Sequence, residues 1–391
     1  MNRKTIIVIL MTLFVGGGVL FYLAGGRKPA VLPAEKGGGE KKTVVDLQGR
    51  QTVFKTPCRS VALPKSADFY ELALILGEDA PGKVAAWGPD MKNNDLDAYN
   101  KFTAAFPELL EKPVLGDISK DALNPEDVLS YRPDVILMDS YMIRRQLKSA
   151  QKLSEAGAPL VYLNNAYDML ENPQKGVAVL GRLFDKEARA AEINDFINAQ
   201  IQAVASRLQN LNGPKPLVYI ESGSSGAAKY GQTYGEDGVH KLHNWGAELV
   251  LAGGENVIDY KLGESVYIDP EFLFKKDPDI IIITGANWPA AADSMRLGFY
   301  AAPEDARVRL DEYAKRPGWE NLKAVKNGRV YAIFSGCVGH AFNFFALQQM
   351  AKWFYPEEFA DIDPEANLKE FYARFMPVEY SGVWAAQMSA R

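Results

Sequence analysis

The chain has 391 residues, of which 47% are hydrophobic and 24% are charged, and its formal net charge is −5. This length exceeds one typical domain and fits two. The mild acidity, with no run of basic residues beyond the N-terminus, excludes a typical nucleic-acid-binding protein.

The N-terminus is predicted to be a secretory address. Arg3 and Lys4 precede an almost wholly apolar stretch over residues 5–23, and small residues occupy 24–26. This order is typical of a signal peptide. The stretch also approaches the roughly 20 residues that span a bilayer, so an uncleaved anchor stays open. We expect residues 1–26 to be a signal peptide or anchor, with any membrane tether running through 5–24. The rest of the chain is expected to lie outside the cytoplasm, in the periplasm or at the extracytoplasmic surface of the membrane.

The next segments predict a flexible tether and a first α/β lobe. Residues 27–42 are rich in Gly, Pro, Lys and Glu, as flexible linkers are. Residues 43–53 alternate between apolar and polar side chains, which predicts a hairpin. Apolar runs then predict strands, separated by helical patterns, at 60–63, 84–87, 113–116, 135–138 and 160–163. The alternation predicts a parallel sheet with helices on both faces, over residues 43–184.

A short passage occurs twice in the chain. Pro125-Glu126 is followed by a Pro-Asp pair and an apolar run, and Pro270-Glu271 opens the same order 145 residues later. Pro and Glu favour the first turn of a helix, a later Pro ends it, and the apolar run suits a buried strand. Two such units predict two lobes of similar build with a cleft between them.

Between the two copies, residues 185–212 predict a long helix that joins the lobes. Apolar residues recur every three to four positions, and Asp185 is expected to cap the start. A second α/β lobe is expected over 213–391. Its predicted strands are 217–220, 280–284 and 329–333, and its predicted helices are 242–251, 308–316, 344–354 and 367–375.

Five segments of the chain resemble segments of a known protein family. They are the repeated Pro-Glu units, residues 251–257, residues 318–331 and residues 351–359. In their order and spacing, over about 43–365, the chain resembles the substrate-binding proteins of bacterial ABC importers for iron-siderophores, haem and cobalamin. The resemblance implies two α/β lobes joined by one long helix, a ligand held in the cleft, and a monomer without catalytic residues or a resident cofactor. It also implies that one Glu per lobe, Glu126 and Glu271, docks on a permease dimer driven by a cytoplasmic ATPase.

The candidate ligand residues follow the carboxyl ends of predicted strands, where open α/β sheets bind ligands. They are Trp87, Tyr141, Arg144, Arg145, Tyr230, Tyr234, Trp288, Arg296 and His340. This set is aromatic and cationic. Arg pairs with anionic oxygens and stacks on planar groups, and Trp and Tyr offer rigid contact area. An anionic ferric chelate, above all an iron-siderophore, is therefore the expected ligand, with haem and cobalamin as alternatives.

Three alternative classes of protein can be compared with the sequence. A bare-metal binder needs a cluster of His and carboxylate ligands, but the chain has three His, of which His240 and His243 are close in sequence and His340 is distant. An enzyme is not expected, because residues 223–226 lack the spacing of a nucleophile elbow. A tethered sensor using the same cleft stays open. Cys58 and Cys337 fall in opposite lobes, and either a bridge or two unpaired thiols is compatible with the sequence.

Overall fold

The computed structural model describes residues 40–139, 146–163, 171–235, 244–258 and 265–390. The N-terminal lobe opens with the antiparallel hairpin of β1 (Lys41–Val45) and β2 (Gln51–Lys55), as predicted. A four-stranded parallel sheet follows, in the order β4-β3-β5-β6. Its strands are β3 (Val61–Leu63), β4 (Val84–Trp87), β5 (Val135–Asp139) and β6 (Leu160–Leu163).

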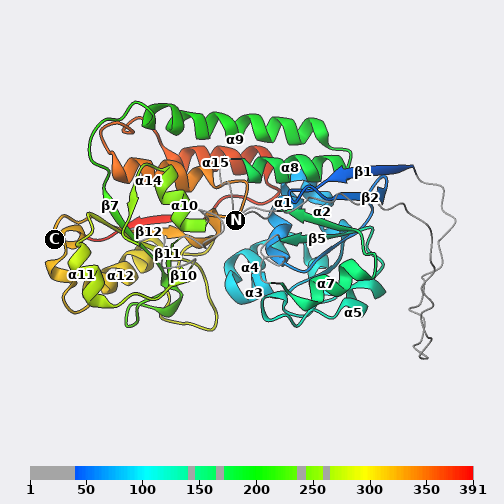
Figure 1. The fold of residues 1–391 in the computed structure, drawn as a ribbon, viewed down its shortest axis with the longest axis horizontal. Coiled ribbons are helices and arrows are strands. Elements are labelled where there is room, and N and C mark those ends of the chain that lie inside the picture. Colours follow the sequence, from blue (N-terminus) through cyan, green and yellow to red (C-terminus); the bar gives the residue numbers. More distant parts are fainter. Residues whose placement is uncertain (1–39, 140–145, 164–170, 236–243, 259–264, 391) are drawn as a thin grey trace, which may run out of the picture. The chain divides into compact units, whose positions relative to one another are not determined.

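Helices connect and cover these strands (Figure 1). They are α1 (Phe69–Leu76), α2 (Ala80–Lys83), α3 (Asp90–Asn94), α4 (Leu96–Ala105), α5 (Pro125–Ser130), α7 (Lys148–Glu155) and α8 (Asn172–Leu183). The strand predicted at 113–116 is wrong. Only Val114 forms an isolated bridge, to Trp87, and although Leu115 is buried, the side chain of Val114 is 67% exposed.

The C-terminal lobe contains a seven-stranded mixed sheet in the order β10-β8-β7-β11-β12-β13, with β9 paired to β7. Its strands are β7 (Leu217–Ser222), β8 (Thr233–Tyr234), β9 (Glu255–Asn256), β10 (Ser265–Val266), β11 (Ile280–Gly285), β12 (Val330–Phe334) and β13 (Ala385–Gln387). The central strands β7, β11 and β12 are parallel, whereas β8 and β13 run antiparallel to their neighbours. Every residue of β11 and β12 is buried, as the β-branched run of β11 predicts for that strand.

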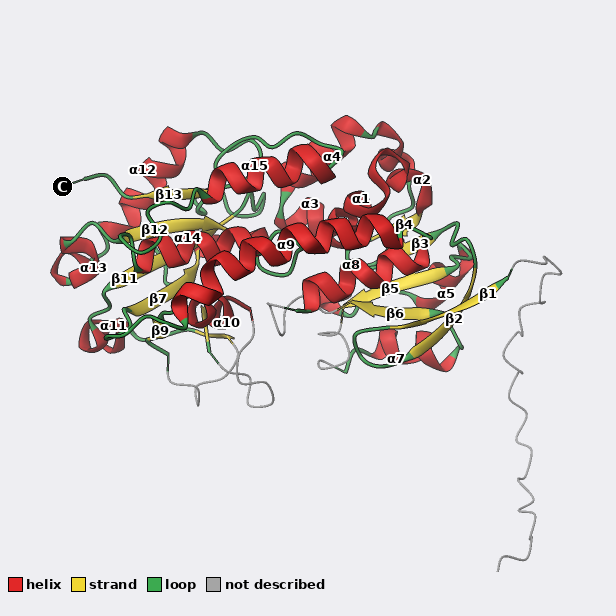
Figure 2. Ribbon diagram, turned by 90° about the horizontal axis from the view of Figure 1, so that it is seen from above, coloured by secondary structure: helices red, strands yellow, loops and turns green. Residues whose placement is uncertain are grey.

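Helices lie around this sheet and between the lobes (Figure 2). Those of the C-terminal lobe are α10 (Asn244–Leu251), α11 (Pro270–Lys276), α12 (Pro303–Ala314), α13 (Lys323–Lys326), α14 (Phe344–Phe354) and α15 (Pro364–Phe375). The repeated passage is confirmed as two helix–strand units. Asn124 accepts a hydrogen bond from the amide of Glu126 at 3.0 Å, and Asp269 accepts one from the amide of Glu271 at 2.8 Å.

One long helix, α9 (Glu187–Leu208), packs against α8 of the first lobe and against α14 and α15 of the second. Its 22 residues correspond to ~33 Å of rise. The predicted capping role of Asp185 is wrong. Lys186 precedes the helix, and Asp185, at a φ of 55°, instead pairs with Lys42 and accepts from Thr56 at 3.1 Å.

The cysteines and the apolar N-terminal stretch both bear on the cellular compartment of the protein. Cys58 and Cys337 are both buried, free thiols. No helix among the described residues is long and apolar enough to cross a membrane. The apolar stretch at 5–24 lies outside the described residues, so its role as signal or anchor stays a prediction.

Candidate functional site

A buried charge cluster lies where two strands of the N-terminal sheet end. Lys65 follows β3, and Asp139 is the last residue of β5. The Lys65 ammonium donates to Asp139 at 2.8 Å and lies 3.7 Å from Asp68. The side chain of Lys65 is 24% exposed, whereas that of Asp68 is only 2% exposed. We call Lys65, Asp68 and Asp139 the strand-end cluster. Its lysine is the member that a ligand can reach.

Asp68 gives this cluster an adjustable charge. Burial raises the pKa of Asp68 to about 8, against the opposing effect of Lys65 and with the support of Asp139 and Glu71. One of its oxygens, Oδ2, forms no hydrogen bond with any described residue. For Lys65, burial alone would lower the pKa, but Asp139 and Asp68 together raise it well above its ordinary value. Burial therefore favours the protonated form of Asp68, and the acidic neighbours of Lys65 favour its charged form.

Trp87, at the end of β4, is turned into the core. Its side chain is 2% exposed, its ring stacks on Tyr99 at 5.7 Å, and it meets the edge of Phe69 at 6.2 Å. Tyr99 is only partly buried, and the Lys92 ammonium lies 5.4 Å from the centre of its ring. Trp87 thus supports Tyr99, which is the more accessible aromatic ring at this strand end.

The loop after β7 is fixed by a second buried ion pair. The Arg316 guanidinium donates to both oxygens of Glu221 at 2.8 Å, and it also donates to the main-chain oxygens of Ala227 and Lys229. Arg316 is 5% exposed and Glu221 is fully buried. Since all three guanidinium nitrogens are engaged, the pair holds the loop that carries Tyr230.

The same arginine orients Tyr230. The Arg316 guanidinium lies 4.6 Å from the centre of the Tyr230 ring, and the indole N–H of Trp319 donates to the Tyr230 hydroxyl at 2.7 Å. Tyr230 lines a surface hollow of about 560 Å³ together with Pro270 and Phe274. Its exposed side therefore faces the start of α11, beside Glu271. Tyr234 is partly buried in β8, and burial raises its pKa.

The loop after β11 connects the two lobes. Asp97 of α4 accepts hydrogen bonds from the Asn287 amide at 2.6 Å and from the Arg296 guanidinium at 3.1 Å. The amide of Tyr300 adds a bond to the same carboxylate at 3.3 Å. Asp97 is 2% exposed and Arg296 is 35% exposed. In this structure Arg296 therefore joins the lobes, while Trp288, close by in the chain, packs partly buried against the core.

His340, after β12, also contacts the other lobe. Its Nδ1 lies 2.8 Å from Glu71 of α1, and Glu71 also accepts from the amide of Ala341 at 3.3 Å. The ring is 4.8 Å from that of Tyr70, and His340 is 6% exposed. Its near burial leaves little of the ring available to a ligand in this arrangement.

The remaining predicted residues have two kinds of position. Tyr141, Arg144, Arg145, His240 and His243 lie outside the described residues. Glu126 and Glu271 are both exposed in the first turns of α5 and α11, and neither forms an ion pair with a described residue. Within the described part of the chain, no group of three or more His, Cys, Asp or Glu is placed to hold a metal ion. The roles assigned to all these residues stay predictions.

The site residues predicted from the sequence do not include Lys65, Asp68 and Asp97. Lys65 and Asp68 do follow the predicted strand at 60–63, so the strand-end rule would have selected them. Asp97 carries no such signal, because its partners are far away in sequence: Asn287 is 190 residues and Arg296 is 199 residues from it.

The geometry can now be compared with known proteins. The model of the periplasmic binding protein family matches residues 85–335, more than half of the chain. The chain belongs to the periplasmic binding protein family. Members of this family are the solute-binding components of ABC importers and work outside the cytoplasm.

Solved structures agree with this assignment. The TroA-like periplasmic binding protein FepB from Veillonella parvula is 36% identical, with a TM-score of 0.81, over 89% of this chain and 99% of that chain. The molybdate periplasmic binding protein MolA of Haemophilus influenzae is 16% identical, with a TM-score of 0.63, over 87% of this chain and 99% of that one. At that identity the second match supports the fold alone.

The name of one curated relative includes a ligand. The high-affinity heme uptake system protein IsdE of Staphylococcus aureus is 28% identical over 168 residues, which cover 43% of this chain and 50% of IsdE. The chain thus spans about half the length of the curated relatives it matches.

Proposed function

We propose that this protein captures a ferric chelate of the iron-siderophore class between its lobes and delivers it to an ABC permease dimer with a cytoplasmic ATPase. The observation that carries the proposal is the strand-end cluster. It places a charged, partly exposed lysine at the carboxyl ends of two parallel strands, in a family whose members bind solutes.

The cluster suits an anionic ligand. An ammonium group has three donors. In Lys65 one of them is directed to Asp139, and the partial exposure of the side chain leaves the ammonium open to a ligand oxygen. Asp68 assists by staying protonated at neutral pH, because an ionised carboxylate so close would repel an anion. Tyr99, with Lys92 over its ring, adds an aromatic and cationic surface on the same lobe.

Delivery to the permease is assigned to Glu126 and Glu271. Each lies exposed at the start of a short helix, and the two helices are the repeated units of the two lobes. Acidic side chains at corresponding places of two lobes would match a pair of basic sites on a permease dimer. We expect charge reversal, Glu126→Lys with Glu271→Lys, to abolish uptake in cells with the cognate importer while ligand affinity in solution is unchanged.

Haem is the second candidate, because the curated relative that matches part of this chain is a heme uptake protein. A carboxylate-bearing porphyrin would use the same lysine, and its flat ring would contact tyrosine. The two candidates differ in their spectra, since bound haem changes its intense near-ultraviolet absorption band.

A direct test is titration of the protein with a ferric catecholate, a ferric hydroxamate and haem, followed by tryptophan fluorescence and by ligand absorption. Saturable quenching at micromolar or lower concentration by a ferric siderophore supports the first proposal. Saturation by haem alone replaces it with the second. No response to any of the three contradicts both.

A further inference from the structure

The outer edge of the C-terminal sheet lies far in sequence from the strand-end cluster, and its features are independent of the proposed ligand. Strand β13 pairs with β12 on one side only. The amide of Phe334 donates to the oxygen of Trp384 at 2.8 Å, and the amide of Met388 donates to the oxygen of Val330 at 3.0 Å. Successive residues of an antiparallel strand direct their main-chain groups to opposite sides. The N–H and C=O groups of Ala385 and Gln387 therefore point away from β12.

These outward groups lie in a gap between two occupied positions. On one side Val383 exchanges two main-chain hydrogen bonds with Gly298, at 2.8 and 3.2 Å. On the other side the amide of Ser389 donates to Asp311 at 2.8 Å. Between them, the main-chain groups of Ala385 and Gln387 have no hydrogen-bond partner among the described residues. Gly298 begins the pairing that an added strand would continue.

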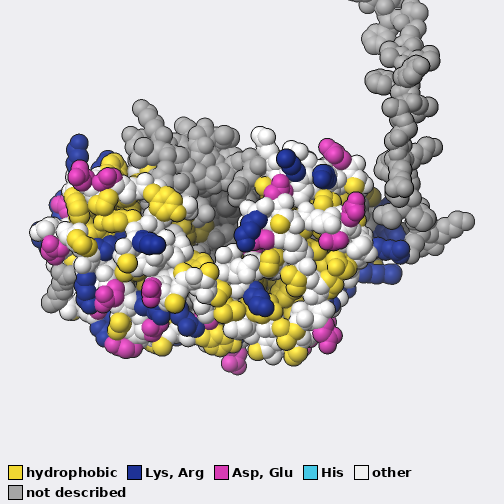
Figure 3. All heavy atoms as spheres, turned by 90° about the horizontal axis from the view of Figure 1, so that it is seen from below, with side chains coloured by type: hydrophobic (Ala, Val, Ile, Leu, Met, Phe, Trp, Pro, Cys, Tyr) yellow, Lys and Arg dark blue, Asp and Glu magenta, His cyan; other side chains and the backbone are white. Residues whose placement is uncertain are grey.

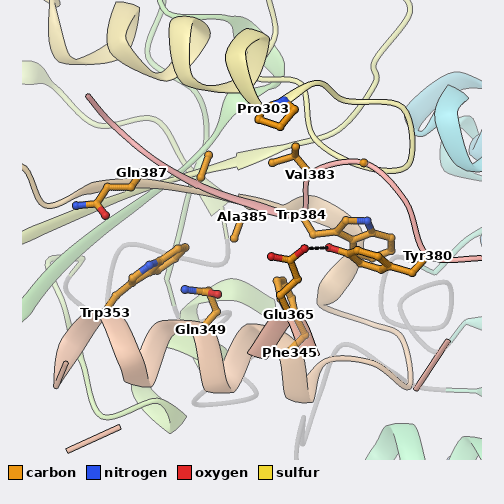
Figure 4. Close-up of a pocket in the computed structure, with 12 residues that line it drawn as sticks. Pro303, Phe345, Gln349, Trp353, Glu365, Tyr380, Val383, Trp384, Ala385 and Gln387 are labelled. Carbon is orange, nitrogen blue, oxygen red and sulfur yellow. Dashed lines mark hydrogen bonds between the residues drawn. The ribbon is translucent and has the colours of Figure 1, made fainter. Parts of the chain in front are cut away.

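A cavity of about 410 Å³ lies along this gap. Figure 4 shows Trp353 and Gln349 rising from α14 on one side of β13 and Pro303, at the start of α12, on the other. Ala385 has only a methyl side chain on the face toward α14, which leaves the space between strand and helix open. The volume falls in the usual range for small-ligand sites, ~300–1,000 Å³.

The residues that line the cavity favour a positively charged ligand. Glu365 is the one charged residue among the residues that line the cavity. It pairs with Lys369 at 2.8 Å, but both side chains are more than half exposed. A surface pair of this kind contributes little, so another cation can replace the lysine. The rings of Trp353 and Tyr380 also line the cavity, and aromatic faces attract cations.

We propose that this groove binds a short extended peptide that carries a Lys or Arg side chain. The peptide adds as a strand to the outward N–H and C=O groups of Ala385 and Gln387, and its cationic side chain lies against Glu365 and the aromatic rings. At ~3.3 Å of rise per residue, the gap accommodates about three peptide residues in extended form.

The probe is acetyl-alanyl-lysyl-alanine amide, added to the isotope-labelled protein. The amide resonances of Ala385 and Gln387 are expected to shift and to exchange more slowly with solvent, whereas that of Ala386, already bonded to β12, should change little. The same peptide with methylated backbone nitrogens is the matched control. Equal binding of the methylated peptide, or no change at Ala385 and Gln387 at millimolar peptide, overturns the proposal.

Two variants separate the main-chain contribution from the charge. Ala385→Pro removes an outward donor without removing a bond to β12, since Pro is tolerated where a strand's N–H faces solvent. We expect it to weaken binding about tenfold, or ~1.4 kcal/mol.

Glu365→Gln should remove the preference for the lysyl peptide over its norleucyl analogue. The matched control Glu320→Gln, which changes an exposed glutamate outside the cavity lining, should preserve that preference. A preference unchanged by Glu365→Gln contradicts the charge assignment even if Ala385→Pro fails to fold.

Discussion

Two of the buried ion clusters among the described residues differ in how completely their hydrogen bonds are made. In the C-terminal lobe one cation meets one carboxylate, and the Arg316–Glu221 pair is completed by the Tyr219 hydroxyl and the amide of Gly231. In the strand-end cluster one cation meets two carboxylates, and one oxygen of Asp68 has no hydrogen-bond partner among the described residues. The first arrangement fixes a loop. In the second, burial raises the pKa of Asp68 to about 8, and perturbed groups of this kind are candidates for a functional site.

The charges on the surface give no such contrast. On the face shown in Figure 3, basic and acidic side chains are interspersed over both lobes instead of forming one patch of a single sign.

The largest expected effect comes from breaking the completed pair. Glu221→Gln leaves the buried Arg316 without its counter-charge, and removing one partner of such a pair costs about 3–5 kcal/mol of unfolding free energy. Urea denaturation measures the loss. The exposed control Glu320→Gln should stay within about 0.5 kcal/mol of the unmodified protein. A small loss for Glu221→Gln would mean that the pair does not hold the loop.

Asp68 should make stability depend on pH. Its folded-state pKa is about 8, whereas an unfolded Asp titrates near ~3.9. Between these values the folded state binds more protons, so stability falls as pH rises from ~4 to ~8, by at most about 1.4 kcal/mol per pH unit.

The measurement is a difference between two proteins. Burial also raises the pKa of Asp95 to about 7 and that of Glu248 to about 8, so they add slopes of the same sign. The unfolding free energies of Asp68→Asn and of the unmodified protein, measured from pH 5 to pH 8, should therefore change with pH at different slopes. Parallel curves would show that Asp68 is already ionised in the folded state.

Asp97 should contribute less than the Arg316–Glu221 pair, since its partner Arg296 is about one-third exposed. Asp97→Asn keeps one acceptor oxygen but loses the charge, and we expect a loss of about 1–2 kcal/mol in urea denaturation. Solution scattering of the variant should show a wider spread of lobe separations. Unchanged stability and scattering would mean that α9 and the other contacts between the lobes, such as that of His340 with Glu71, hold the lobes without the charge of Asp97.

The smallest effect is expected at Glu126 and Glu271. Both are exposed and unpaired with any described cation, so Glu126→Gln with Glu271→Gln should change the unfolding free energy by less than about 0.5 kcal/mol. A larger loss would give these residues a structural role in place of the proposed docking role.

Local sequence patterns predicted most of the fold. The apolar run at 84–87 and the helix at 344–354 match β4 and α14 residue for residue. Local sequence patterns did not predict elements that form through contacts between residues far apart in the chain. The segment Ala385–Gln387 has no strand signal of its own, and it becomes β13 because the open edge of β12 pairs with it.

The candidate site was less predictable than the fold, for the same reason. The strand-end rule selected regions, but it did not show which way a side chain turns. Trp87 was selected for its residue type, yet it lies in the core. Arg296 and His340 were selected as ligand contacts, yet here they pair with carboxylates of the other lobe, Asp97 and Glu71. These partners are almost 200 or more residues away in the chain, beyond the reach of any local pattern.

The most direct test of the central claim is the affinity of Lys65→Met for the ligand found by titration, compared with that of Lys148→Met, which changes an exposed lysine of α7. Lys65 supplies a charge-assisted contact in this account, so Lys65→Met should bind an anionic ferric chelate about tenfold more weakly, or ~1.4 kcal/mol, while Lys148→Met should bind normally. Equal affinities of both variants and the unmodified protein would contradict the assignment of the strand-end cluster as the ligand site.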